Sequence, residues 1–155
     1  MPVSTTGVPP SLTNTLALAL TVYGEARGES LLGQLAVASV IDNRRKDGRW
    51  GASFLSVVLA PRQFSCWNET DPNRATLLRI ADQMSTPEGQ VSLQKDRIWH
   101  RCLWIADGVM RQLVPSPVAG ATHYFSTSLP VPPTWARTGR FIQKIDAHLF
   151  YDSVR

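Results

Sequence analysis

The segment LTNTLALALTVYGEARGE, residues 12–29, joins an apolar stretch to a short polar one. Its apolar positions recur every three or four residues, which predicts a helix over residues 12–23 with Ser11 or Thr13 as the cap. Gly24 and Gly28 then enclose three residues, and this spacing predicts a helix end or a tight bend at that point. The apolar positions of the predicted helix are Leu16, Ala19, Leu20 and Tyr23.

Glu25 stands between these two glycines, directly after the apolar helix. We therefore expect its carboxyl group at the edge of the core, where partial loss of water favours the neutral, protonated form. A protonated glutamic acid is the general acid that glycosidic cleavage requires. The alternative is an ion pair between Glu25 and Arg27 at the end of a helix, without any chemistry.

The rest of the chain predicts a mostly helical α+β domain. Residues 30–46, 54–60, 72–84 and 95–113 read as helices, the third opened by Asp71 and Pro72, and residues 85–94 read as a loop. Trp99 and Trp104 on the last helix are expected in the core. Residues 121–125, 141–145 and 148–151 read as strands, which predicts a small C-terminal antiparallel sheet. Residues 1–11 read as a flexible lead.

Length and charge bound the possible functions. The chain has 155 residues, 43% of them hydrophobic, which is the size of one domain. Its formal net charge of +4 is too small for a nucleic-acid tail, and the excess lies in residues 91–155, so we expect an anionic partner there. The apolar run Leu16–Val22 is too short for a signal peptide or a membrane span. The basic residues that we expect to meet the anionic partner are Arg97, Arg101, Arg111, Arg137, Arg140 and Lys144.

The sequence predicts no metal site. Cys66 and Cys102 cannot form a four-ligand zinc site alone, and the three histidines are widely separated. The two cysteines are either buried thiols or one disulfide, and the sequence leaves this choice open.

Seven short blocks, in order, resemble the spore-cortex-lytic (SleB-like) cell wall hydrolase family, in the form found in phage endolysins and proteobacterial hydrolases. Together they extend over most of the chain, and their order is far more specific than any one of them. The blocks are YGEARGE at 23–29, GQLAVA at 33–38, VIDNR at 40–44, QFSCW at 63–67, GATHY at 120–124, PTWA at 133–136 and HLFY at 148–151.

The resemblance implies a lysozyme-like fold related to lytic transglycosylases, with residues 12–155 as the catalytic domain. It implies cleavage of the β-1,4 bond between N-acetylmuramic acid and N-acetylglucosamine in peptidoglycan, with Glu25 as the catalytic acid. We expect no cofactor and a monomer that does not insert into membranes. An endolysin of this kind is made in the host cytoplasm and acts on the cell wall after release.

A one-carboxylate route fits these residues best. Glu29 is the nearest second carboxylate, but it would lie on the same wall of a cleft as Glu25, so we interpret Glu29 and Arg27 as structural residues beside the site. A hydrolytic muramidase is the main alternative. A zinc-dependent N-acetylmuramoyl-L-alanine amidase would need His100, His123 and His148 to converge, and a non-enzymatic wall-binding module would leave Glu25 unexplained.

The remaining candidates are substrate-binding residues. Gln63, Ser65 and Trp67 lie on a non-helical segment that could line a sugar groove, although Trp67 could equally fill the core. His123 and Tyr124 alternate on a strand, so only one should face the cleft, and Tyr124 is the better candidate because its hydroxyl stays neutral. Trp135, among prolines, is expected at the rim of the cleft.

Overall fold

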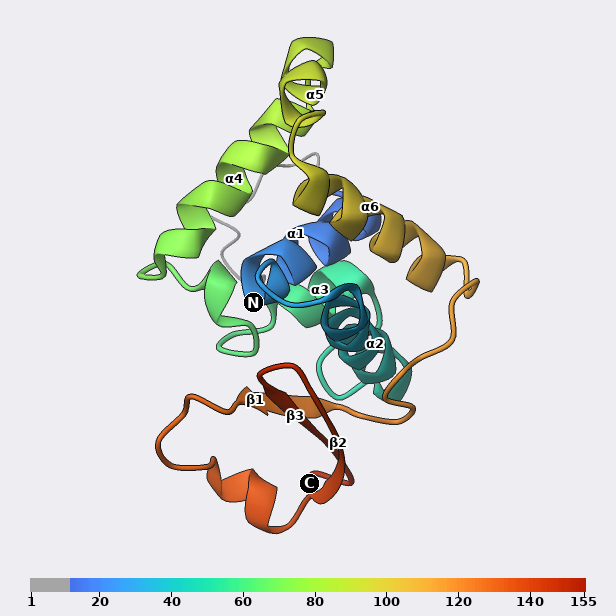
Figure 1. The fold of residues 1–155 in the computed structure, drawn as a ribbon, viewed down its shortest axis with the longest axis vertical. Coiled ribbons are helices and arrows are strands. Elements are labelled where there is room, and N and C mark those ends of the chain that lie inside the picture. Colours follow the sequence, from blue (N-terminus) through green and yellow to red (C-terminus); the bar gives the residue numbers. More distant parts are fainter. Residues whose placement is uncertain (1–11) are drawn as a thin grey trace.

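The computed structural model describes residues 12–155, so the expected lead at residues 1–11 lies outside the described residues. Helix α1 (Asn14–Ala26) runs through the centre of the helical part (Figure 1). Thr13 caps it, accepting a hydrogen bond from the Leu16 backbone N–H at 3.2 Å. Most of its side chains are buried, on all sides, as expected for a helix enclosed by other helices.

Helix α1 corrects one prediction, because it does not end at Gly24. The helix continues through Gly24 and Glu25 to Ala26, so Glu25 projects from its last turn. Gly24 keeps a helical backbone and serves instead to let another segment approach closely, as described below. Gly24 was therefore misread as a turn signal, whereas Gly28 does lie in the turn after α1, and the helix ends within the segment in which an end was predicted.

Four further helices surround α1, near the predicted positions. They are α2 (Leu31–Asp47), α3 (Phe54–Leu59), α4 (Pro72–Met84) and α6 (Arg97–Met110). Ser30 and Asp71 cap α2 and α4 with their side chains. Gly48, at φ 89°, ends α2 in the left-handed conformation that favours glycine. A single 3₁₀ turn, η1 (Ser65–Trp67), lies in the stretch predicted as irregular.

Residues 85–94 form a helix where a loop was predicted. Helix α5 (Pro87–Leu93) starts at the Thr86 cap, which accepts from the Gly89 N–H, with Pro87 at the first position. Leu93 is the only buried residue of α5, and the sequence of this helix accordingly shows no apolar period. The capping signal was present, but the periodicity on which the prediction relied was not.

The C-terminal part forms an antiparallel sheet in the order β1-β3-β2. The strands are β1 (His123–Ser126), β2 (Arg140–Ile145) and β3 (His148–Asp152), and a short turn, η2 (Thr134–Arg137), lies between β1 and β2. Tyr124 pairs with Phe150, and a register shift lies between Phe141 and Gln143. The predicted fold class, mostly helical with a small C-terminal antiparallel sheet, is confirmed.

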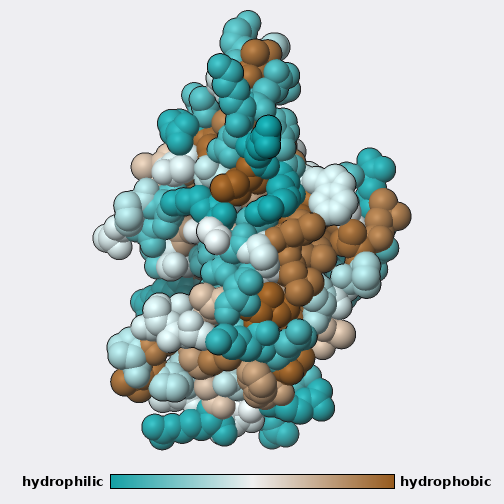
Figure 2. Space-filling model, in the orientation of Figure 1, coloured by the Kyte–Doolittle hydropathy of each residue, from teal (hydrophilic) through white to brown (hydrophobic). Residues whose placement is uncertain are grey.

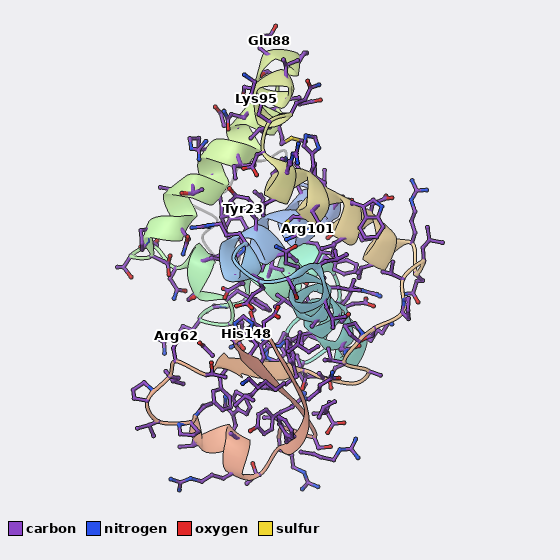
Figure 3. The ribbon with its side chains drawn as sticks, viewed as in Figure 1. Tyr23, Arg62, Glu88, Lys95, Arg101 and His148 are labelled. Atoms are coloured by element: carbon purple, nitrogen blue, oxygen red, sulfur yellow. The ribbon has the colours of Figure 1, made fainter. Side chains whose placement is uncertain are left out.

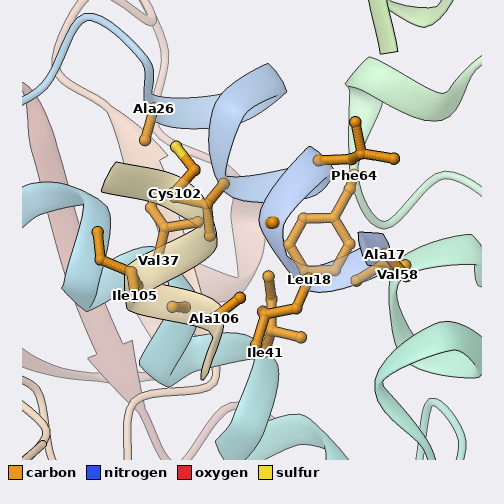
Figure 4. Packing of buried hydrophobic residues seen from close by; sticks show 14 of the residues in the cluster. Ala17, Leu18, Ala26, Val37, Ile41, Val58, Phe64, Cys102, Ile105 and Ala106 are labelled. Carbon is orange, nitrogen blue, oxygen red and sulfur yellow. The ribbon is translucent and has the colours of Figure 1, made fainter. Parts of the chain in front are cut away.

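The core lies mainly between α1, α2, α3 and α6. Figure 4 shows Leu18 of α1 packed among Ile41, Val58 and Phe64 from three other segments. Trp99 is fully buried as predicted, but the prediction for Trp104 is wrong, since it is 59% exposed. Leu31 and Leu32 are also exposed, and Figure 2 shows an apolar area where α2 and α6 meet.

Three other predictions bear on the whole chain. Cys66 and Cys102 are both free and buried, so the disulfide alternative is not supported. Among residues 12–155, no helix is long and apolar enough to cross a membrane. The six basic residues named above lie on two separate parts of the fold, three on α6 and its C-cap and three in η2 and β2 (Figure 1).

Candidate active site

Glu25 lies where three distant segments of the chain meet. The backbone N–H of Cys66 in η1 donates to Glu25 Oε1 at 3.2 Å. The Tyr124 hydroxyl of β1 donates to Glu25 Oε2 at 3.5 Å. Residues of η1 and β1 thus hold the carboxylate that α1 presents. Glu25 is half-buried, so it keeps contact with solvent.

Gly24 makes the contact between η1 and Glu25 possible. A Cβ atom at position 24 would lie 2.7 Å from Cys66 Cβ and 2.8 Å from Cys66 Sγ. Only glycine lets the η1 turn pack this closely on α1. The glycine before Glu25 is therefore explained by close approach rather than by a bend.

Tyr124 faces the helices and stays neutral. Its ring contacts His148 and Phe150, with centroids 5.0 and 5.6 Å away, on the inner face of the sheet. Burial, and then the charge of Glu25, raise the pKa of Tyr124 well above its ordinary value. The hydroxyl can therefore donate to Glu25 throughout the physiological pH range.

His123 lies on the opposite face of the sheet from Tyr124. Its ring contacts Trp50 and Trp135, with centroids 5.5 and 4.9 Å away. Burial, together with the nearby charge of Arg44, lowers the pKa of His123 to about 4. The structure thus gives His123 a packing role and leaves the Glu25 side of the sheet to Tyr124.

Trp135 also lies away from Glu25. It packs against His123, Phe125 and Tyr151, which share the outer face of the sheet. The prediction that Trp135 forms the rim of the Glu25 cleft is therefore not supported. These contacts place Trp135 of η2 over the outer face instead.

Of the three groove candidates in residues 63–67, two are exposed and one is buried. Gln63 and Ser65 are exposed, and Gln63 Oε1 accepts from Arg44 Nη1 at 2.9 Å. Trp67 is only 9% exposed, and its indole N–H donates to Thr21 Oγ1 at 2.9 Å. The structure favours the packing role for Trp67.

Glu29 and Arg27 contact segments next to Glu25 rather than Glu25 itself. Glu29 Oε2 accepts from the Ala147 N–H at 3.4 Å, and Glu29 Oε1 lies 3.9 Å from His148 Nδ1. Figure 3 shows His148 where the sheet meets the helical part. Arg27 donates to Asn73 Oδ1 at 2.6 Å, and no ion pair with Glu25 forms among residues 12–155.

The sequence did not single out Arg44, whose side chain bonds the segments that lead into β1 and η1. Arg44 is 5% exposed, and its Nε donates to the Thr122 carbonyl oxygen at 2.7 Å. The signal was its position, because Arg44 follows Val37, Val40 and Ile41 on the buried face of α2. A charged residue at a core position of a helix is uncommon and indicates a specific role.

The thiol beside Glu25 is unreactive. Burial, and then the charge of Glu25, raise the pKa of the Cys66 thiol far above its ordinary value. Burial raises the pKa of Cys102 to about 12. Neither thiol forms the thiolate that nucleophilic catalysis needs at neutral pH.

The residues do not fit a zinc site. His100 is exposed on α6, His123 lies on the outer face of the sheet, and His148 lies on its inner face. In residues 12–155 no three His, Cys, Asp or Glu side chains are arranged to hold a metal ion. The convergence that a zinc-dependent amidase would require does not occur.

Comparison with protein families and curated proteins gives consistent matches. The model of the family described as Cell Wall Hydrolase matches residues 28–151, beginning three positions after Glu25. The spore cortex-lytic enzyme of Halalkalibacterium halodurans is 30% identical over 86% of this chain, and that of Bacillus cereus is 29% identical over the same share. The chain spans 33% and 42% of the lengths of these two proteins.

Two solved structures have a similar fold. The catalytic domain of the germination-specific lytic transglycosylase SleB from Bacillus anthracis is 28% identical, with a TM-score of 0.60, over 94% of this chain and 100% of that one. The catalytic domain of Bacillus cereus SleB is 30% identical, with a TM-score of 0.58, over 95% and 97%. None of the proteins named here is a phage endolysin, so that part of the resemblance stays a prediction.

Proposed function

Because this chain belongs to the cell wall hydrolase family, we propose that it cleaves peptidoglycan as a lytic transglycosylase, with Glu25 as the catalytic residue. One observation carries the proposal. Three segments from different parts of the fold converge on a single half-buried carboxylate, which two hydrogen-bond donors hold in place. The likeness to the SleB catalytic domain, a lytic transglycosylase, supports the same reaction.

The reaction begins with protonated Glu25. Glu25 donates its proton to the oxygen that leaves with N-acetylglucosamine, and the bond from that oxygen to the muramoyl C1 breaks. The carboxylate that forms accepts hydrogen bonds from the Cys66 N–H and the Tyr124 hydroxyl. These neutral donors stabilise the negative charge as it develops.

The same carboxylate then completes the reaction. It accepts the proton of the muramoyl C6 hydroxyl while that oxygen bonds to C1. The product is a 1,6-anhydromuramoyl end, and no water is consumed. This route needs no second carboxylate about 5 to 9.5 Å from the first, which supports it here because the Glu29 side chain is bonded to the β2–β3 hairpin.

The test is digestion of purified peptidoglycan, followed by mass spectrometry of the products. We expect anhydromuramoyl ends from the unaltered protein and a loss of about 10²- to 10⁴-fold in rate for Glu25→Gln. The matched control is Glu88→Gln, an exposed carboxylate on α5 (Figure 3), which should keep full activity.

Other products would contradict this mechanism. Reducing muramoyl ends would identify a hydrolytic muramidase, and free stem peptides with intact glycan would identify an amidase. Full activity in a folded Glu25→Gln protein, checked by circular dichroism, would remove Glu25 from the mechanism.

A further inference from the structure

Arg44 is a buried cation whose hydrogen-bond partners are all neutral. Its Nε donates to the Thr122 carbonyl at 2.7 Å, and its Nη1 donates to Gln63 Oε1 at 2.9 Å. Its guanidinium carbon lies 4.5 Å from the Trp50 ring centre and 5.2 Å from that of Phe64. Within residues 12–155, no carboxylate forms an ion pair with Arg44.

A buried charge without a counter-charge is costly, so its retention calls for a reason. Burial lowers the pKa of Arg44 to about 10, and the guanidinium therefore remains positive at neutral pH. Cation–π contacts offset part of the cost but do not neutralise the charge. The protein thus holds a desolvated positive charge for which an anion is the complementary ligand.

The position of Arg44 links it to Glu25. Thr122, its first partner, is two residues from Tyr124, and Gln63, its second, is three residues from Cys66. Tyr124 and Cys66 are the two residues that hold the Glu25 carboxylate. Arg44 therefore connects the two segments that meet at Glu25, and the charges of Arg44 and Glu25 both act on the pKa of the same Tyr124 hydroxyl.

One atom of the guanidinium is still available. Nη2 has no hydrogen-bond partner among the described residues, and the edge shared by Nη1 and Nη2 can bind a carboxylate with two parallel hydrogen bonds when Gln63 releases Nη1. Gln63, which contacts this edge, is exposed, so a ligand can approach from its side.

We propose that Arg44 and Gln63 form a carboxylate-binding subsite beside Glu25 that recognises muramoyl residues. The inference rests on the proposed function and adds a basis for its specificity. Muramoyl residues carry a lactyl group on C3, near the C1 atom at which the bond breaks, and N-acetylglucosamine has no such group. The lactyl carboxylate is free in peptide-free glycan, and elsewhere it is amide-bonded to a stem peptide that has carboxylates of its own. A cation at this position selects the muramoyl side of the alternating glycan.

The test measures binding in a protein that cannot turn substrate over. Glu25→Gln protein is titrated calorimetrically with peptide-free peptidoglycan chains, whose lactyl carboxylates are free, and with the same chains after amidation of those groups. We expect the free-carboxylate chains to bind about 10-fold more tightly, as charge-assisted hydrogen bonds require. A third titration uses chains that keep their stem peptides, and it distinguishes the lactyl carboxylate from the carboxylates of the stem peptide.

Gln63→Glu, added to the same background, is the discriminating variant. It places a carboxylate of the protein on Arg44 from an exposed position, so the fold should persist and the 10-fold preference should fall to about one. The control is Gln94→Glu, the same charge change at an exposed position after α5, which should leave the preference intact. If peptide-bearing chains alone show a preference that Gln63→Glu removes, the carboxylate belongs to the stem peptide.

Equal binding of the free and amidated chains, with no preference for peptide-bearing chains, would overturn the subsite. So would a preference that survives both Gln63→Glu and Arg44→Lys. Failure of the proposed function would look different, because the unaltered protein would then release no fragments with anhydromuramoyl ends from peptidoglycan, whichever chains it binds.

Discussion

At the scale of single residues, the site depends on Gly24 as much as on Glu25. The glycine allows η1 to lie against α1, which brings the Cys66 N–H to within hydrogen-bonding distance of the carboxylate. The four residues Gly24, Glu25, Cys66 and Tyr124 therefore act as one unit. A change that separates η1 from α1 should affect catalysis without touching any atom of the substrate.

Gly24→Ala tests this dependence. The new Cβ would overlap Cys66, so we expect the free energy of unfolding to fall by about 1–3 kcal/mol and the rate of glycan cleavage to fall by about 10-fold or more. Urea denaturation and product release measure the two effects. Gly28→Ala is the control, because nothing lies within 4 Å of its added Cβ. Equal behaviour of the two variants would contradict this role for Gly24.

At the scale of elements, the two faces of the sheet have different roles: the inner face contacts the helices and Glu25, and the outer face packs against Trp135. Its inner face carries Tyr124, His148 and Phe150 toward the helices, whereas its outer face carries His123 and Tyr151 under Trp135. Strand alternation makes this separation unavoidable. It explains why adjacent residues in GATHY have unrelated functions.

The outer face should make the protein sensitive to acid. The pKa of His123 is about 4 in the folded protein and 6.5 ordinarily, so between these values the unfolded chain binds a proton that the folded chain excludes. Stability therefore falls as the pH falls from 6.5 to 4. For this half-buried group we expect a loss of about 1–2 kcal/mol.

His123→Asn should lack this part of the acid sensitivity. Urea denaturation at pH 7 and pH 4 measures the difference between the variant and the unaltered protein. The exposed His100→Asn variant serves as the control and should follow the unaltered protein. If His123→Asn and the unaltered protein lose the same stability on acidification, His123 does not carry the effect.

At the scale of the whole molecule, the positive charges are distributed rather than gathered. Arg111 and Arg140 are paired with Asp107 and Asp152, which leaves less free charge than the count of basic residues suggests. The net charge of +4 nevertheless favours a polyanionic partner. We expect this attraction to be long-range and general, and Arg44 to supply the specific contact.

Binding to isolated peptidoglycan sacculi should therefore weaken with salt. The Debye length falls from about 10 Å at 0.1 M salt to about 3 Å at 1 M, so we expect the affinity to fall several-fold over this range. Cosedimentation measures it, with circular dichroism at both salt concentrations to confirm that the fold is unchanged. Affinity that does not change with salt would show that the net charge has no part in wall binding.

The sequence alone determined where most of the helices and the sheet lie, because periodicity and caps are local features, and the resemblance to a family indicated Glu25 as the candidate acid. It missed α5, whose cap lacked an apolar period, and it placed Trp104 in the core. The tertiary structure alone decided which groups reach Glu25. The Cys66 N–H and the Tyr124 hydroxyl come from segments that are far from Glu25 in the chain. Their meeting depends on close packing across α1 and on the face that each strand residue presents, and neither is a property of a short stretch of sequence.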